Sequence, residues 1–345
     1  MCARAAFLTL ALAGACSPLA PLETVRFEGE TMGTTYLVQV AGPVSQSERI
    51  GISRELQQRL DRIDGWMSTY DPSSDVSRFN MQPAGERFPI AQSTFDVLRE
   101  ARAVSELTQG AFDVTVAPLV RLWGFGAGAK DDSELPTDAE ITEAQARTGY
   151  AQLTLFEDPP SVAKSADGVE CDLSGIAKGY AVDEVAKLLD ERGVRDFMVE
   201  IGGEVRTSGK NAEGEAWRIG IEKPIPGARA LERVVRLSGL SMATSGDYRN
   251  FYEVDGKLYS HLIDPRTGRP VAHRLASVSV VAHSCMRADA LASGLLVLGP
   301  DAGFDLAVQK DLAVLFLIRS EDGEIEERPS PSFEQLFKGV PRIEP

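Results

Sequence analysis

The sequence predicts an α+β fold in which largely antiparallel sheets pack against helices. Short apolar stretches of strand type mostly meet their neighbours through hairpins, and the strongest turn signal is Asp255-Gly256, between predicted strands 248–253 and 257–261. Several longer stretches carry apolar residues at helical spacing. The chain has 345 residues, 43% hydrophobic and 25% charged, so it can bury a full core as one large domain or two intertwined lobes.

The first half of the chain is predicted to hold a strand pair and then helices. The strand pair is interrupted by the glycine of Met32-Gly-Thr-Thr-Tyr36. The segment after the first helix is dense in turn residues and is expected to be a loop. In chain order these elements are a strand pair over 27–40, a helix over 47–67, the loop over 67–80, a helix over 93–108, and a surface helix within 130–148.

The clearest amphipathic helix is predicted over residues 177–191, where apolar residues recur every three or four positions. Asp183 stands four residues before Lys187, a spacing that supports a helix, and Ser174 is the expected N-cap. Lys178 in the first turn adds a cation to the free backbone N–H groups, which suits an anionic ligand such as a phosphate. The alternative is an ordinary capped helix with a solvated Lys178, and spacing alone favours it.

The second half of the chain is predicted to alternate strands and helices, and its tail is expected to be polar and loosely held. Besides the hairpin, we expect strands over 197–201, 217–221, 234–237, 276–282 and 313–318, helices over 286–298 and 301–310, and the tail over 321–345.

The N-terminus is predicted to be a targeting segment. Arg4 precedes a short apolar run that is too brief to span a bilayer, and Leu12-Ala-Gly-Ala-Cys16 is similar to a bacterial lipoprotein processing site. Ala13 departs from the leucine usual there, so plain secretion is the alternative. We expect a signal peptide over 1–15, a lipidated tether over 16–26, and an exported protein anchored through Cys16 at the periplasmic face of the inner membrane.

The charge and the cysteines limit the possible functions. A formal net charge of -15, with no basic cluster to offset it, argues against a nucleic-acid partner. An anionic ligand would therefore need a local cation or a metal. Cys171 and Cys285 show no metal-type spacing and are expected to be buried free thiols, with a disulfide between them as the minor alternative.

One predicted helix carries a candidate metal site. Asp289 and Ser293 stand four residues apart, so a carboxylate and a hydroxyl share one helix face. Hard oxygens of this kind suit Mg²⁺, which often completes its shell with phosphate and water. The alternative is a small-residue helix packed against a sheet, and the pair alone favours that reading.

The segment from Asp172 to Asp183 resembles the Asp-x-Ser-x-x-x-Lys-Gly-Tyr-x-x-Asp signature of the ApbE family, the FAD:protein FMN transferases. Further stretches match the same family in the same order, from about residue 27 to about residue 298. The resemblance implies an ApbE-like, T-fold-like architecture for a single flavin transferase domain over 27–320.

The resemblance also implies a set of site residues. Asp289 and Ser293, where the family commonly has threonine, would bind Mg²⁺ together with the backbone carbonyl near Gly175. His261, in Ser260-His-Leu-Ile-Asp, would accept a proton from the acceptor hydroxyl or position the pyrophosphate of the nucleotide. His273 and His283 match no such motif. The residues implied to bind FAD are Met32, Tyr70, Ala111, Phe112, Asp113, Asp172, Lys178, Arg249 and Leu262.

The implied activity is a Mg²⁺-dependent transfer of FMN from FAD to a threonine or serine hydroxyl of a target flavoprotein, with release of AMP. The expected acceptors are flavin-bearing subunits of membrane redox complexes. Two alternatives remain: a Mg²⁺-dependent FAD pyrophosphatase, which uses water as acceptor, and a non-catalytic FAD-binding lipoprotein. The aromatic Tyr70 mildly favours the transferase.

Overall fold

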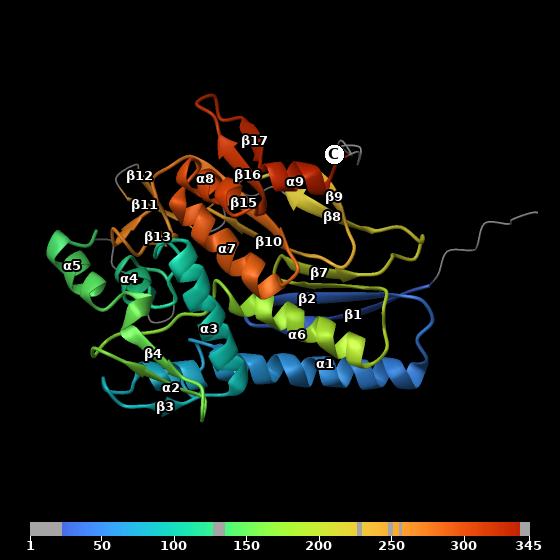
Figure 1. Ribbon diagram of the computed structural model, residues 1–345, viewed down its shortest axis with the longest axis horizontal. Helices are drawn as coiled ribbons and strands as arrows, with labels where there is room; N and C mark the ends of the chain where they lie inside the picture. Colours follow the sequence, from blue (N-terminus) through green and yellow to red (C-terminus); the bar gives the residue numbers. More distant parts are fainter. Residues whose placement is uncertain (1–22, 127–134, 226–229, 248–250, 255–256, 339–345) are drawn as a thin grey trace, which may run out of the picture.

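A computed structural model describes residues 23–126, 135–225, 230–247, 251–254 and 257–338 (Figure 1). Its centre is an eight-stranded sheet in the order β1-β2-β6-β7-β10-β15-β16-β17, and every neighbouring pair whose register is known is antiparallel. The predicted α+β class is therefore confirmed. The expected signal peptide, Cys16 and Arg249 lie outside the described residues. In order along the sheet, the strands are β1 (Thr24–Thr31), β2 (Thr34–Ala41), β6 (Phe197–Ile201), β7 (Glu204–Ser208), β10 (Ser241–Gly246), β15 (Leu275–Ala282), β16 (Ala313–Arg319) and β17 (Ile325–Pro329).

Helices cover one face of this sheet, with α6 in contact with both α1 and α7 (Figure 1). The predicted helices are confirmed, because their periodic apolar residues, such as Ile52, Leu56 and Leu60, are all buried in the main core. Among the described helices, none is both long and apolar enough to cross a membrane. The helices of this layer are α1 (Gln46–Met67), α3 (Gln92–Leu107), α6 (Ala177–Glu191), α7 (Cys285–Leu298) and α8 (Ala302–Gln309).

The opposite face carries a second, smaller core beneath the hairpin of β8 (Trp217–Glu222) and β9 (Leu231–Leu237) and beneath α9 (Pro331–Leu336). The expectation of a loosely held tail is wrong for much of the segment, since β17 pairs with β16 and Phe333 is fully buried. Only a few apolar side chains anchor this segment to the core. Its polar composition therefore did not predict that it is ordered.

The segment between α1 and α3 also differs from expectation. We predicted a loop, but α2 (Asp75–Asn80) forms there because the Ser74 hydroxyl accepts a hydrogen bond from the backbone N–H of Ser77. The predicted surface helix is confirmed as α5 (Asp138–Ala146). The remaining elements are β3 (Phe88–Pro89), α4 (Ala117–Leu122), η1 (Tyr150–Gln152), β4 (Leu153–Phe156), β5 (Ser161–Lys164), and the pairs β11 (Phe251–Val254) with β12 (Lys257–Ser260) and β13 (Ile263–Asp264) with β14 (Arg269–Pro270).

The start of α6 corrects the predicted N-cap. The helix begins at Ala177 after Ile176, which provides no side-chain cap, whereas Ser174 lies in the preceding turn and donates its backbone N–H to Asp172 Oδ1 at 2.8 Å. The cap comes from another helix instead. Asp289 Oδ2, on α7, accepts the backbone N–H of Gly179 at 3.0 Å. Local sequence could not indicate this partner, which lies 110 residues away.

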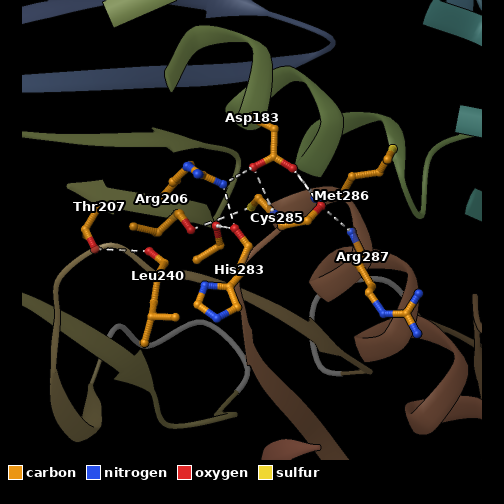
Figure 2. Close-up of polar contacts among 11 residues, drawn as sticks. Asp183, Arg206, Thr207, Leu240, His283, Cys285, Met286 and Arg287 are labelled. Atoms are coloured by element: carbon orange, nitrogen blue, oxygen red, sulfur yellow. Dashed lines mark hydrogen bonds and ion pairs between the residues drawn. The ribbon is translucent and has the colours of Figure 1, made fainter. Parts of the chain in front are cut away.

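Asp183 has a role that its spacing from Lys187 did not predict, because Lys187 pairs with Glu184 instead. Figure 2 shows Asp183 between Arg206 of β7 and the first residues of α7. Its carboxylate accepts hydrogen bonds from the backbone N–H groups of Cys285 and Met286, at 3.0 and 3.1 Å, and from the Ser284 hydroxyl at 2.8 Å. The helices α6 and α7 thus cap each other's N-termini with one carboxylate each.

Candidate active site

A cleft of about 890 Å³ opens where the start of α6, the β6–β7 turn, α7 and β10 meet. Among the described site residues, Met32 is not in its lining, because it is in the β1–β2 turn, half-buried against the main core. Arg249 lies outside the described residues. The cleft is lined by the other predicted site residues, namely Tyr70, Ala111, Phe112, Asp113, Asp172, Gly175, Lys178, His261, Leu262, Asp289 and Ser293.

The floor of the cleft depends on close packing between α6 and α7. A Cβ placed on Gly179 would overlap the Cys285 carbonyl oxygen and would lie 2.8 Å from Asp289 Cβ. In the turn just before α6, a Cβ on Gly175 would lie 3.3 Å from Ser293 Oγ. Glycine at these two positions therefore lets the start of α6 approach the face of α7 that carries Asp289 and Ser293.

Three charged groups meet on this floor. Lys178 Nζ lies 3.1 Å from Glu204 Oε2 and 4.0 Å from Asp289 Oδ1. Both carboxylates are almost fully buried, whereas about a quarter of the Lys178 side chain, 27%, is exposed toward the cleft. One ammonium group therefore faces two buried carboxyl groups in a region with little water.

Burial dominates the ionisation of the two carboxylates. It raises the pKa of Asp289, against the opposing effects of Lys178 and the Gly179 N–H. Burial also raises the pKa of Glu204, to about 8, although the Lys178 ammonium acts to lower it. For Lys178 burial acts to lower the pKa, but the two carboxylates outweigh it and the pKa is raised. Lys178 is therefore a permanent cation at neutral pH.

The oxygen donors on α7 fit a magnesium site of the kind that borrows ligands from phosphate. Asp289 supplies a carboxylate, and the Ser293 hydroxyl, which shares a hydrogen bond of 3.0 Å with the Ser245 hydroxyl, supplies a second hard oxygen. Within the described ranges, no group of three or more His, Cys, Asp or Glu side chains is arranged to hold a metal. A cation here would therefore need backbone, phosphate or water oxygens to complete its shell.

The other end of the cleft is aromatic and partly open. The ring of Tyr70 is 76% exposed at the rim, and Phe112 is buried. Asp113 is buried as well, and its two carboxylate oxygens accept hydrogen bonds from Thr115 and from the backbone N–H of Tyr150. Asp113 therefore holds its own loop in place beside the cleft.

His261 follows β12 and projects into the cleft lining, where its ring lies edge-on to Phe125 with 6.2 Å between the ring centroids. Leu262 is half-buried beside it. The imidazole thus lies in the same cleft as the charged floor, where it could accept a proton from a bound substrate.

Sequence reasoning missed Glu204, which the β6–β7 turn brings into the cleft. The available signal was Gly202-Gly203-Glu204 directly after a predicted buried strand. Cys171 and Cys285 are buried free thiols, as predicted, and burial raises the pKa of each. Neither thiol is therefore activated for chemistry.

Comparison with known proteins identifies the family of this chain. The model of the ApbE family matches residues 32–316. The chain belongs to the ApbE family. It is 42% identical to the FAD:protein FMN transferase of Vibrio cholerae, over 96% of this chain and 98% of that one. It is 36% identical to the protein of the same name from Escherichia coli K12, over 91% of this chain and 90% of that one.

Solved ApbE structures share the fold. The flavin transferase ApbE from Vibrio cholerae, 42% identical, superposes with a TM-score of 0.84 over 91% of this chain and 99% of that chain. The apo flavinyl transferase ApbE from Pseudomonas stutzeri, 37% identical, gives 0.82 over 92% and 98%. The expected ApbE-like architecture is therefore confirmed.

Proposed function

We propose that this ApbE family member is a Mg²⁺-dependent FAD:protein FMN transferase that moves FMN from FAD to a threonine or serine hydroxyl of a target flavoprotein. The observation that carries the proposal is the cleft itself, which joins Lys178, Asp289, Ser293 and His261 to an aromatic rim. The names of its relatives support the same activity. A cleft of about 890 Å³ also has the capacity for a dinucleotide-sized ligand.

In the proposed reaction, the hydroxyl oxygen of the acceptor attacks the phosphorus of the FMN half of FAD. A new O–P bond forms, the P–O bond to the AMP half breaks, and AMP leaves with the bridging oxygen. His261 takes the proton of the attacking hydroxyl, and the Lys178 ammonium stabilises the charge that develops on the leaving oxygen. Tyr70 and Phe112 contact the flavin ring.

Asp289, Ser293 and the backbone carbonyl near Gly175 are the groups that would hold Mg²⁺. When bound, the ion supplies charge neutralisation on the pyrophosphate oxygens. The remaining catalytic contribution is the positioning of FAD and acceptor by this chain, since phosphoryl transfer asks little covalent chemistry of the protein.

The proposal includes export. A signal peptide over residues 1–15 would direct export and be removed, and a lipid on Cys16 would then hold the enzyme at the periplasmic face of the inner membrane. Flavin-bearing subunits of membrane redox complexes are the proposed acceptors there. Acylation is tested by intact mass of the membrane-extracted protein and by release of a Cys16→Ala variant from the membrane.

The activity is tested with the purified chain, FAD, Mg²⁺ and an acceptor peptide of the type Asp-Gly-x-Thr-Gly-Ala-Thr, followed by intact mass. A gain equal to FMN on the threonine, abolished by EDTA, is the expected result. Free FMN and AMP beside an unmodified acceptor would instead identify a pyrophosphatase. Bound but unchanged FAD would identify a storage protein.

A further inference from the structure

The Lys178 ammonium lies between carboxylates from two different elements. Glu204 begins β7 and Asp289 lies on α7, and Lys178 is 3.1 Å from the first and 4.0 Å from the second. The side chains of Glu204 and Asp289 are only 4% and 3% exposed, so neither is screened by much water. Glu204 is thus the nearer carboxyl group, although nothing in the proposed reaction has used it.

The β6–β7 turn fixes Glu204 and also packs against the stem of Lys178. Gly202 and Gly203 have φ values of +62° and +107°, in the left-handed region that favours glycine. A Cβ on Gly202 would lie 3.1 Å from Lys178 Cδ, so the lysine stem rests on this glycine. Ile201 and Glu204 are paired across the turn, which sets the glutamate beside the lysine head.

Two cations would compete for Asp289 if it had to serve both. Under the proposed function, on which this argument rests, Asp289 is the carboxylate that holds a divalent ion. The Lys178 ammonium, 4.0 Å from Asp289 Oδ1, would repel that ion and would itself be drawn toward Asp289. A second carboxylate that forms an ion pair with the ammonium removes this competition.

We propose that Glu204 is a positioning residue that holds the Lys178 ammonium in the cleft and away from Asp289, so that Asp289 stays available to a divalent cation. Glu204 acts through Lys178 and not on the reacting atoms. Without Glu204, Asp289 is the carboxylate left within ion-pair distance of Lys178. The ammonium then forms an ion pair with Asp289 and competes with the divalent ion for its carboxylate.

The test is a calorimetric titration of the full chain with Mg²⁺ alone, in the absence of FAD. It is run at about pH 8.5, above the pKa of Glu204 of about 8, so that Glu204→Gln removes a charge. We expect Glu204→Gln to raise the Kd for Mg²⁺ about tenfold. The double variant Lys178→Met/Glu204→Gln removes both charges and should recover at least the affinity of the unchanged chain.

Glu222→Gln is the matched control, because it removes a negative charge elsewhere in the lining of the same cleft. Its Kd for Mg²⁺ should stay within about twofold of the unchanged chain. In the transfer assay at the same pH of about 8.5, Glu204→Gln should raise the KM for Mg²⁺ while excess Mg²⁺ restores kcat. A merely structural role for Glu204 would lower activity at every Mg²⁺ concentration.

Two results overturn the proposal: an unchanged Mg²⁺ affinity in Glu204→Gln, or a double variant that binds Mg²⁺ as weakly as the single one. If Glu204→Gln does not fold, Glu204→Asp takes its place in the titration: its side chain is one methylene shorter and holds the Lys178 ammonium less closely than the present 3.1 Å, so the Kd for Mg²⁺ should again rise, and an unchanged Kd would overturn the proposal. An unchanged chain that binds Mg²⁺ but transfers no FMN refutes the proposed function and leaves the role of Glu204 intact. One that takes up no Mg²⁺ even when FAD is added overturns both.

Discussion

Asp183 and Asp289 occupy matching places at the two ends of the α6–α7 contact and differ in how many donors they meet. Asp183 accepts hydrogen bonds from Arg206, Ser284 and two backbone N–H groups of α7. Asp289 is more deeply buried, accepts one backbone N–H, and faces the cleft beside Lys178. A carboxylate saturated by protein donors can only hold the structure together, whereas one with free lone pairs in a cleft can still bind a cation.

The largest expected effect comes from Asp289→Asn. The amide oxygen can still accept the Gly179 N–H, so we expect the free energy of unfolding to fall by less than about 1 kcal/mol. Transfer of FMN should fall by about 1000-fold or more, because the anionic oxygen for the metal is gone. Intact-mass time courses and urea unfolding measure the two quantities. Full activity in this variant would contradict the assignment of cation binding to Asp289.

Gly179→Ala breaks the contact on which both caps depend. The added Cβ meets the Cys285 carbonyl, which is backbone and cannot move aside cheaply, so we expect a loss of about 3 kcal/mol in urea unfolding. Gly65→Ala is the control, since that α1 position has open space and ordinary backbone geometry. It should stabilise the chain by about 0.5–1 kcal/mol. Equal effects of the two substitutions would contradict the close packing.

Asp183→Asn should show the reverse pattern to Asp289→Asn. An amide cannot accept all four hydrogen bonds, and Arg206 loses its ion pair, so we expect the free energy of unfolding to fall by about 2 kcal/mol. FMN transfer by the folded fraction should drop less than about tenfold. A loss of transfer as deep as that of Asp289→Asn, at unchanged stability, would place Asp183 in the chemistry.

The smallest effect, measured per pH unit, is a pH dependence that originates on the cleft side. The pKa of Glu204 is raised to about 8 in the folded chain, so the folded state holds a proton that the unfolded state has already released. Stability contributed by this group is full below its unfolded pKa and is lost as the pH rises toward about 8. The unchanged chain should therefore lose stability relative to Glu204→Gln by at most about 1.4 kcal/mol per pH unit over this interval. Parallel stability curves would contradict the raised pKa.

Much of the site was predictable because its residues carry local signals. Asp289 and Ser293 are four residues apart on a helix whose bounds the apolar pattern predicted closely, and the structure brings both into the cleft. Lys178 was recognised in the first turn of a predicted helix, and it also lines the cleft. Helix periodicity therefore placed these residues on the correct helix faces. The resemblance to the ApbE family singled them out as site residues, since their spacing alone favoured a packed helix and a solvated lysine.

Glu204 was missed because its environment is not local. Its strand, β7, lies inside the main sheet but was not predicted, and the same holds for β10, whose residues are mostly small or polar. Small side chains on β10 allow α7 to pack closely on the sheet. Because these side chains are small or polar, β10 lacks the alternating apolar residues by which a strand is recognised in the sequence. The turn that presents Glu204 is therefore recognisable only once the sheet is formed.

The sequence by itself determined the class of fold, the helices that carry the site and the resemblance to the ApbE family, because these depend on local apolar patterns and on short motifs in a fixed order. Tertiary structure alone decided which charges meet. Asp289 caps α6 across 110 residues, Asp183 caps α7, and Glu204 reaches Lys178 through the β6–β7 turn. Strand pairing and helix packing bring these groups within a few ångströms, and electrostatic interactions in a buried site depend on that distance and not on sequence separation.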